Sequence, residues 1–264
     1  MSRGPEGEEA FFVESETASQ ASMFANLSPE DRAALYQLFE TYLRENPDVV
    51  SQALQVTRAQ AQARSNQSIP VAIQALEEQI YEDPNTPVRG GADADVTIVE
   101  FFDYRCGYCR RAHPVLDTLL ASDPKIRIVY KEYPILGEIS LLAAQAALAA
   151  RHQGKYAEFH DLLYQEQGAR SSERLFQVAA QAGLDIERLR ADMQDPDIMD
   201  ALVQNRDLGR ALNVTGTPTF VIGDRIIQGF VNLDAMQQAV AQARAAQAAA
   251  AAQSATTEPA DVRP

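Results

Sequence analysis

The chain has 264 residues, 46% of them hydrophobic, and its 37 acidic against 23 basic residues give a net charge of −14. This length allows one sizeable hydrophobic core with a smaller appendage, or two small domains. The acidic balance argues against nucleic acid as a partner, because phosphate binding needs a basic surface. No run of sequence approaches the roughly 18–20 consecutive apolar residues of a membrane-spanning helix.

The first 27 residues are acidic and polar, a composition typical of disordered segments. A secretory signal needs a basic start and an apolar run of about 7–15 residues, and neither is present. Two interpretations stay open for this terminus. The protein is cytoplasmic, or its signal has been removed or lies upstream of Met1.

Residues 28–83 are predicted to be helical. Ser28 followed by Pro29 is typical of an N-cap and a first helical position, and Asn46-Pro47 separates one helix from the next. Apolar residues recur at helical spacing as far as Ile80, and proline and glycine then gather between residues 84 and 91. We therefore expect a helical segment that is separate from a domain beginning at about residue 88.

The domain at residues 88–246 has a different pattern. Strands are predicted at 96–102 and 126–130, and a hairpin is predicted from 217–222 and 225–227. Helices are predicted after Cys106, throughout an insert at about 138–210, and from Asn232, whereas residues 247–264 are predicted to be a disordered tail. The order βαβ, helical insert, ββα predicts an α/β fold with helices on both faces of a central sheet.

Both cysteines of the chain lie in one motif, Cys106-Gly107-Tyr108-Cys109. A disulfide across two residues closes almost no loop and adds little stability, so the pair favours a bond that is made and broken. Cys106 lies where a strand should end and a helix should begin, and a helix N-terminus stabilises a thiolate. Cys109 lies one turn further and is expected to be buried. Cys106 should therefore attack a substrate, and Cys109 should resolve the mixed disulfide.

Other residues near the motif allow several interpretations. A zinc site is the main alternative to redox chemistry, but the chain has no second CXXC pair to supply four ligands. His113 is expected to have a surface or packing role, and His152 and His160 are expected on helix surfaces. Positive charge gathers around Cys106, at Arg105, Arg110 and Arg111.

Glu100 and Thr217-Pro218 are the remaining candidates for the site. Glu100 lies within an apolar strand, where it either points to solvent or is a buried carboxyl with a raised pKa that exchanges a proton with Cys109. The residue pattern leaves both possibilities open. Thr217-Pro218 begins a predicted strand, and its own residues do not decide between a cis and a trans peptide bond.

The stretches VEFFDYRCGYCRRAHP and TGTPTFVIG together resemble the thioredoxin superfamily, and within it the DsbA-like thiol–disulfide oxidoreductases of bacteria. The resemblance covers roughly residues 88–246 and implies a thioredoxin-like fold with an inserted helical domain. It implies that Cys106 is the exposed nucleophile, that Cys109 is its buried partner, and that Glu100 is the family's buried acidic residue. It also implies that Thr217-Pro218 is a cis-proline loop beside the cysteines, which pairs with an extended substrate backbone.

Gly107 and Tyr108, the residues between the cysteines, resemble those of a disulfide isomerase, whereas strongly oxidising family members carry Pro-His there. Without that histidine the nucleophile should be less acidic and the disulfide less oxidising. We expect an isomerase acting on unfolded or misfolded cysteine-containing proteins, with no cofactor beyond the redox-active Cys106–Cys109 disulfide. A dithiol copper-binding protein of copper stress and a one-way disulfide oxidant stay open as alternatives.

The segment LRENPDVVSQAL, within residues 28–83, resembles the N-terminal stalk of ScsC-type DsbA-like proteins, in which the stalk drives oligomerisation. Amphipathic stalk helices have little of their own to bury, so we expect a dimer or trimer formed through residues 28–83. Packing of the stalk on its own catalytic domain is the alternative. Disulfide exchange on protein clients suits an oxidising compartment, so we expect a periplasmic protein that a membrane or soluble thiol-redox partner resets.

Overall fold

The structure, a computed structural model, describes residues 27–166 and 171–257. The predictions for residues 1–26 and 258–264 therefore lie outside the described residues. The chain divides into two compact units, the first ending at Arg64 and the second beginning at Ser65. Each unit is described by itself.

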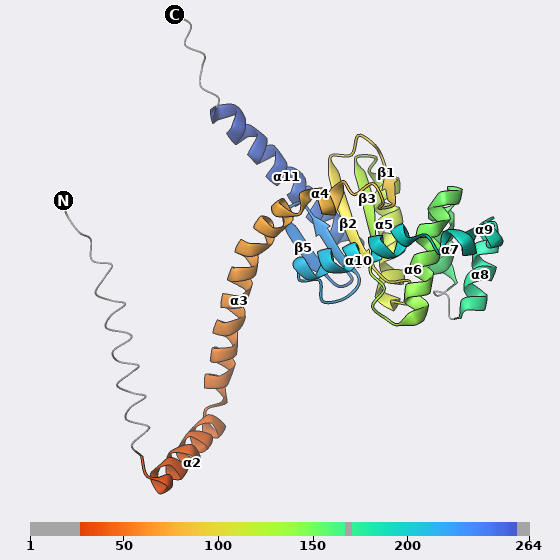
Figure 1. The fold of residues 1–264 in the computed structure, drawn as a ribbon. Helices are drawn as coiled ribbons and strands as arrows, with labels where there is room; N and C mark the ends of the chain where they lie inside the picture. The colour runs from red at the N-terminus through yellow and green to blue at the C-terminus, as the bar shows by residue number, and fades with distance from the viewer. Residues whose placement is uncertain (1–26, 167–170, 258–264) are drawn as a thin grey trace, which may run out of the picture. The chain divides into compact units, whose positions relative to one another are not determined.

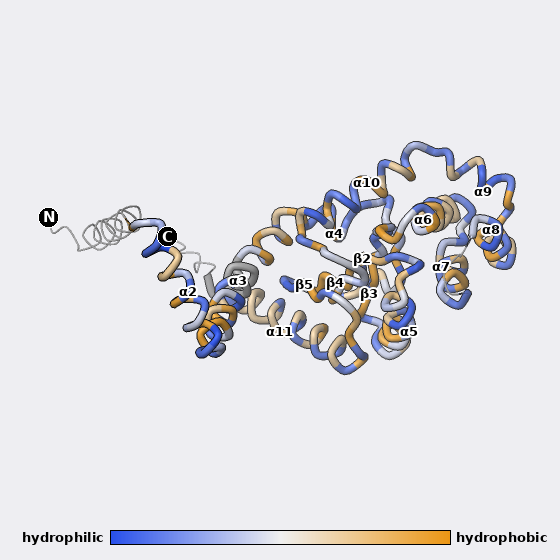
Figure 2. Tube along the Cα trace, turned by 90° about the horizontal axis from the view of Figure 1, so that it is seen from below, coloured by the Kyte–Doolittle hydropathy of each residue, from blue (hydrophilic) through white to orange (hydrophobic). Residues whose placement is uncertain are grey.

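The first unit contains helix α2 (Pro29–Glu45) and the first part of α3 (Pro47–Ala75). As predicted, the Ser28 hydroxyl accepts a hydrogen bond from the backbone N–H of Asp31 at 3.1 Å, and Pro29 begins the helix. No residue of α2 is buried, although hydrophobic residues alternate with hydrophilic ones along it (Figure 2). The helices predicted from the sequence are thus present, and within this unit their apolar side chains are exposed.

The second unit is built on a five-stranded sheet with the order β1-β3-β2-β4-β5. Its strands are β1 (Val88–Gly90), β2 (Val96–Phe102), β3 (Ile126–Glu132), β4 (Thr219–Ile222) and β5 (Arg225–Gln228). β2 and β3 are parallel, whereas β1, β4 and β5 run antiparallel to their neighbours. This is the thioredoxin-like α/β fold, and the central strands and the hairpin lie where the sequence predicted them.

Helices cover both faces of this sheet. On the face of β2 that carries Ile98 and Phe102, the core includes α5 (Gly107–Ser122), α11 (Leu233–Thr257) and the inserted helices. On the face that carries Val99 and Phe101, the core includes the end of α3, α4 (Glu77–Tyr81) and α10 (Pro196–Ala211). Because side chains alternate along a strand, Glu100 belongs to the same face as Ile98 and Phe102, towards α5.

The helical insert is confirmed and runs from Glu138 to Ala211. Two of its helices have side-chain N-caps, because Ser171 and Asp185 accept hydrogen bonds from backbone N–H groups three residues further along the chain. Figure 1 shows α6 to α9 gathered at one side of the sheet. The insert consists of α6 (Glu138–Ala150), the short helix η1 (Arg151–Gln153), α7 (Tyr156–Gln165), α8 (Ser172–Gln181), α9 (Ile186–Asp192) and α10 (Pro196–Ala211).

Two predicted boundaries need correction. The stalk was predicted to extend to residue 83, but Ile73 and Ile80 are buried against β2 and β3, so the end of α3 and all of α4 belong to the catalytic domain. The tail was predicted to be disordered from residue 247, but α11 continues to Thr257, since alanine has the highest helix propensity. The sequence also missed β1, which ends at Gly90 with a φ of 115°. A Cβ at Gly90 would lie 2.4 Å from the Ile126 carbonyl oxygen, so only glycine fits.

Candidate functional site

The CXXC motif lies where β2 leads into α5. Cys106 is the N-cap of α5, and its backbone N–H donates to the Asp103 carbonyl at 3.0 Å. Cys109 lies in the first turn of the helix, and both cysteines are free thiols. Cys109 is completely buried, whereas Cys106 is 8% exposed. The expected order of exposure is therefore correct, but Cys106 is more covered than the resemblance implied.

The two thiols have opposite acidities. Hydrogen bonds lower the pKa of Cys106 to about 5: the largest contribution comes from the Cys109 thiol, followed by the Thr217 side chain and the backbone N–H groups of Cys109 and Tyr108. Burial raises the pKa of Cys109, and its hydrogen bond to Cys106 and the negative charge of Glu100 add to the effect. At neutral pH the first cysteine is a thiolate and the second is a thiol.

Glu100 is buried, with 1% of its surface exposed, and its Oε1 has no hydrogen-bond partner among the described residues. Burial raises the pKa of Glu100 to about 8, and the negative charge of Cys106 contributes to the shift. The sequence left open whether Glu100 points to solvent or is buried, and the structure places the side chain in the core. Its charge interacts with both cysteines, so the three groups form one electrostatic cluster.

Thr217-Pro218 completes the group of residues selected from the sequence. The peptide bond between them is cis, as the resemblance implied. The Cys106 thiol lies 3.2 Å from the Thr217 carbonyl oxygen, so the loop covers the sulfur from one side. The Pro218 carbonyl accepts a hydrogen bond from the backbone N–H of Gly229 at 2.8 Å, which joins this loop to the segment after β5.

Gly107 and Tyr108 lie in the first turn of α5. Gly107 is the first residue of the helix, and only the guanidinium of Arg110 comes within 4 Å of the position of a Cβ there. The Tyr108 side chain is 56% exposed, and the Arg111 guanidinium lies 4.4 Å from the centre of its ring. Tyr108 therefore forms part of the surface next to Cys106 and not part of the core.

Asp103 is a residue of the site that the sequence reasoning missed. Its buried carboxylate accepts hydrogen bonds from the Ser140 hydroxyl and from the backbone N–H groups of Arg105, Ile135 and Leu136, at 2.8–3.0 Å. These bonds fix the turn before Cys106 to the loop between β3 and α6. An aspartate directly after the apolar strand and three residues before the cysteine was the available signal.

A second missed feature is a buried polar cluster beside α5. His160, expected on a helix surface, is fully buried, and its Nδ1 lies 3.0 Å from the Tyr104 hydroxyl. Tyr104 also donates to Glu132, which receives a second hydrogen bond from Tyr156. Burial raises the pKa of Glu132 well above its usual value. The periodic pattern of α7 could have placed His160 inside, since it lies four residues before the buried Tyr164.

Part of this cluster has the spacing of a metal site. Ligand atoms of His113, His160 and Asp161 lie within 4.8 Å of one another. However, Arg89 Nη1 lies 2.9 Å from Asp161 Oδ1 and 3.2 Å from a carboxylate oxygen of Asp117. The guanidinium already supplies the positive charge that a metal ion would bring, so these residues fit an ion-pair network better than a metal centre.

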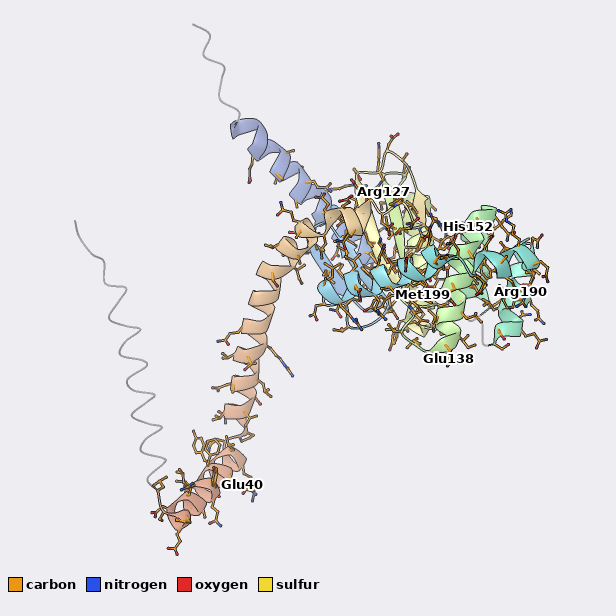
Figure 3. The ribbon with its side chains drawn as sticks, viewed as in Figure 1. Glu40, Arg127, Glu138, His152, Arg190 and Met199 are labelled. Atoms are coloured by element: carbon orange, nitrogen blue, oxygen red, sulfur yellow. The ribbon has the colours of Figure 1, made fainter. Side chains whose placement is uncertain are left out.

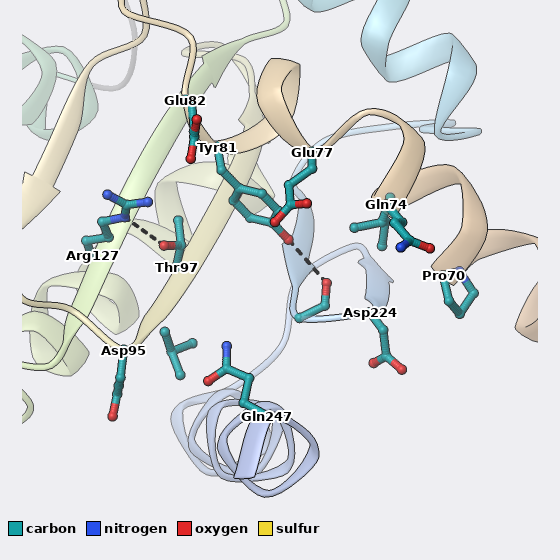
Figure 4. Close-up of a pocket in the computed structure, with 13 residues that line it drawn as sticks. Pro70, Gln74, Glu77, Tyr81, Glu82, Asp95, Thr97, Arg127, Asp224 and Gln247 are labelled. Carbon is teal, nitrogen blue, oxygen red and sulfur yellow. Dashed lines mark hydrogen bonds between the residues drawn. The ribbon is translucent and has the colours of Figure 1, made fainter. Parts of the chain in front are cut away.

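Two cavities lie near the site's scaffold. An apolar groove of about 390 Å³ borders the loop that Asp103 holds, between Ile135, Leu141 and Leu202; Glu138 and Met199, labelled in Figure 3, also line it. The cavity in Figure 4, also about 390 Å³, lies at the opposite end of β2 from the cysteines, beside Thr97, Arg127 and Tyr81. The first cavity includes Ile135, whose backbone N–H donates to Asp103, whereas the lining of the second includes none of the site residues.

The comparisons with known proteins agree with this geometry. A family model described as thioredoxin matches residues 82–242. The chain belongs to the thioredoxin family. A thioredoxin-like oxidoreductase from Silicibacter pomeroyi is 46% identical, with a TM-score of 0.62, over 63% of this chain and 96% of that one. The thiol–disulfide exchange protein α-DsbA2 from Wolbachia pipientis is 30% identical, with a TM-score of 0.64, over 68% of this chain and 97% of that one.

The resemblance also extends to the N-terminal helices. Proteus mirabilis ScsC in a transitional conformation is 25% identical, with a TM-score of 0.61, over 84% of this chain and 98% of that one. This chain is therefore a DsbA-like protein of the thioredoxin fold with a CXXC pair at the start of α5.

Curated relatives include a Na⁺/H⁺ antiporter, NhaA 3, from Salinispora tropica. It is 35% identical over 158 residues, which are 59% of this chain but 24% of the antiporter. The chain thus spans about a quarter of the length of this relative. Within residues 27–166 and 171–257, no helix combines the length and hydrophobicity that a membrane span requires.

Proposed function

We propose that the protein catalyses thiol–disulfide exchange in unfolded or misfolded protein substrates and acts mainly as a disulfide isomerase. Cys106 is the nucleophile, Cys109 is the resolving thiol, and Glu100 exchanges the proton of Cys109. The Thr217-Pro218 loop holds the extended backbone of the substrate beside Cys106. The observation that carries the proposal is the inequality of the two thiols, one with its pKa lowered to about 5 and the other with its pKa raised by burial.

The chemistry begins with the Cys106 thiolate. It attacks a substrate disulfide, the bond between the two substrate sulfurs breaks, and one substrate cysteine leaves as a thiolate. In isomerisation, another substrate thiolate then attacks the mixed disulfide, forms a new substrate disulfide and releases Cys106, so there is no net oxidation. If rearrangement fails, Cys109 gives its proton to Glu100 and attacks Cys106, which releases the reduced substrate and leaves the Cys106–Cys109 disulfide.

Glu100 suits the second of these routes. With a pKa of about 8, roughly a tenth of this carboxyl is ionised at pH 7 while Cys106 is a thiolate. Cys106 loses its charge when it enters a mixed disulfide, and the repulsion that helps to raise the pKa of Glu100 is removed. The carboxylate therefore becomes more available as a base at the stage at which Cys109 must lose its proton.

Isomerase activity is favoured over one-way oxidation by the residues between the cysteines. Neither Gly107 nor Tyr108 can donate a charged hydrogen bond to the thiolate, so these two side chains add no stabilisation to the neutral hydrogen bonds that lower the pKa of Cys106 to about 5. An isomerase must be reduced when it meets its substrate. The measurement that separates the two functions is the reduction potential of the Cys106–Cys109 pair. A value near that of strong periplasmic oxidants would support the one-way oxidant instead.

The proposal includes self-association through the first unit. The apolar side chains exposed on α2 and the start of α3 are more numerous than is usual on the surface of a monomeric protein. An exposed apolar stripe of this kind favours association with a second copy of the chain. Several catalytic sites in one assembly would hold a misfolded chain by avidity. These side chains are Leu35, Tyr36, Leu38, Phe39, Tyr42, Val50, Leu54 and Val56.

The experiment that tests the function is reactivation of scrambled ribonuclease in a glutathione buffer. We expect the full-length protein to restore activity and the Phe39→Glu variant to do so more slowly, because Phe39 is 58% exposed on α2 and a charge there should oppose association. Glu40→Gln, on the same helix, is the control. Light scattering measures the assembly of each variant. Full isomerase activity from a Phe39→Glu monomer would overturn the role of association, and absence of activity in every form would overturn the isomerase itself.

We place this activity in an oxidising compartment such as the periplasm, because catalytic disulfide exchange on protein substrates requires one. A periplasmic thioredoxin-like protein from Salmonella enterica serovar Typhimurium is among the similar structures. After each oxidation of the pair, a membrane or soluble thiol-redox partner must return two electrons to it. The redox state of Cys106 and Cys109 in cell fractions, trapped with a thiol-alkylating reagent, tests this placement.

A further inference from the structure

The surface next to Cys106 contains an arginine held between two aromatic rings. The Arg111 guanidinium lies 4.4 Å from the centre of the Tyr108 ring and 5.0 Å from the centre of the Phe230 ring. Tyr108 is in the first turn of α5, whereas Phe230 follows β5, so the three side chains join the cysteine helix to a separate loop. Contact of a guanidinium with aromatic faces fixes its plane and leaves its N–H edge available.

This arrangement is tied to the loop that covers the nucleophile. Phe230 directly follows Gly229, whose N–H donates to the Pro218 carbonyl at 2.8 Å. The Thr217 carbonyl of the same loop lies 3.2 Å from the sulfur of Cys106. A substrate chain bound to this loop with its cysteine at Cys106 would therefore have neighbouring residues close to Arg111.

The charge of Arg111 is not neutralised by the protein. In the described part of the chain no carboxylate forms an ion pair with Arg110 or Arg111, in contrast to Arg244, which contacts both Asp95 and Asp123 at 2.7 Å. An exposed and oriented guanidinium beside the nucleophile is the chemistry that recognises a carboxylate.

We propose that Arg111, held between Tyr108 and Phe230, binds a carboxylate near the reacting cysteine of the substrate. The protein then prefers substrate disulfides whose attacked cysteine is flanked by aspartate or glutamate. The inference rests on the proposed thiol–disulfide exchange and adds a substrate class to it. Because the overall charge repels acidic chains, the local positive charge selects those that approach at the correct face.

The test uses three short peptides in which one cysteine is flanked by glutamate, glutamine or lysine and is joined by a disulfide to 2-thiopyridine. The rate at which the reduced protein releases the chromophore measures attack by Cys106. We expect the glutamate peptide to react about three- to fivefold faster than the glutamine peptide, a rate difference of the size expected of a partly exposed charge pair. The lysine peptide should react more slowly than the glutamine peptide. Raising the salt concentration should reduce the difference.

Arg111→Gln should abolish the preference for glutamate over glutamine. The ratio of two peptide rates within one variant cancels any change in the thiolate fraction of Cys106. Arg110→Gln is the matched control, since it removes the same charge one residue away, and no aromatic ring of the described residues stacks on the Arg110 guanidinium. If both variants lost the preference for glutamate equally, the preference would come from the general positive charge of this surface, and the proposed carboxylate site at Arg111 would be overturned. Equal rates for all three peptides would overturn the inference but leave thiol–disulfide exchange intact, whereas no reaction with any peptide would overturn the exchange itself.

Discussion

Replacement of Glu100 by glutamine tests the electrostatics of the buried site. The pKa of Glu100 is about 8 in the folded protein, against an ordinary value of 4.5. Below pH 4.5 the carboxyl is neutral in both the folded and the unfolded states, so it carries no electrostatic penalty. Between the two pKa values the unfolded state loses its proton while the folded state keeps it. The free energy of unfolding should therefore fall by about 1.4 kcal/mol for each pH unit across this window.

At pH 7 the accumulated penalty is about 3 kcal/mol, because pH 7 lies roughly 2.5 units above the unfolded pKa. Glu100→Gln keeps the shape of the side chain and removes the titration. We expect the reduced variant to be more stable than the wild type by about this amount at pH 7, and nearly equal to it below pH 4.5.

Urea denaturation of the reduced proteins at several pH values measures this difference. Glu138→Gln is the matched control, because it makes the same substitution at an exposed carboxyl at the start of α6. Parallel stability curves for the wild type and Glu100→Gln would refute the raised pKa. In single-turnover assays the same variant should also slow the attack of Cys109 on the mixed disulfide, and its rate should lack the rise with pH that ionisation of Glu100 is expected to give the wild type.

Three further predictions follow from the structure. Alkylation of Cys106 by iodoacetamide should titrate with a midpoint of about 5, and Thr217→Val should move that midpoint upwards, because a hydrogen bond to the thiolate is lost; an unchanged midpoint would contradict this role. Asp103→Asn should lower stability to urea by about 2–3 kcal/mol, since an amide cannot accept all four hydrogen bonds. Ile80→Ala should cost about 3 kcal/mol, whereas the exposed Val56→Ala should cost little; equal losses would contradict the assignment of α4 to the catalytic domain.

Most of the scaffold could be predicted from local patterns in the sequence. The apolar run at 96–102, the cap at Ser28 and the hairpin around Gly223 each carry their structural signal within a few residues. The short strand β1 could not be predicted in this way, because it depends on pairing with Val129 and its neighbours about forty residues further on. The same holds for Ile73 and Ile80, since helical spacing shows an apolar face but not the surface that covers it.

The candidate site was predictable as far as its residues act in a recognised motif. Cys106, Cys109 and the cis bond at Pro218 are brought together as the resemblance implied, and Glu100 is buried. Asp103 and His160 were missed because their importance comes from partners distant in the sequence, such as Ile135 for Asp103 and Tyr104 for His160. The position of Arg111 between two rings was hidden for the same reason, since Phe230 lies more than a hundred residues after Tyr108.

The central claim is that the two cysteines have unequal roles in attack on protein disulfides. The most direct measurement is mass spectrometry of the mixed disulfide that forms when the reduced protein meets scrambled ribonuclease. We predict that Cys109→Ser accumulates a covalent complex joined through Cys106, and that Cys106→Ser, whose remaining thiol is fully buried, forms none. A complex joined through Cys109, or equal trapping by the two variants, would contradict the account.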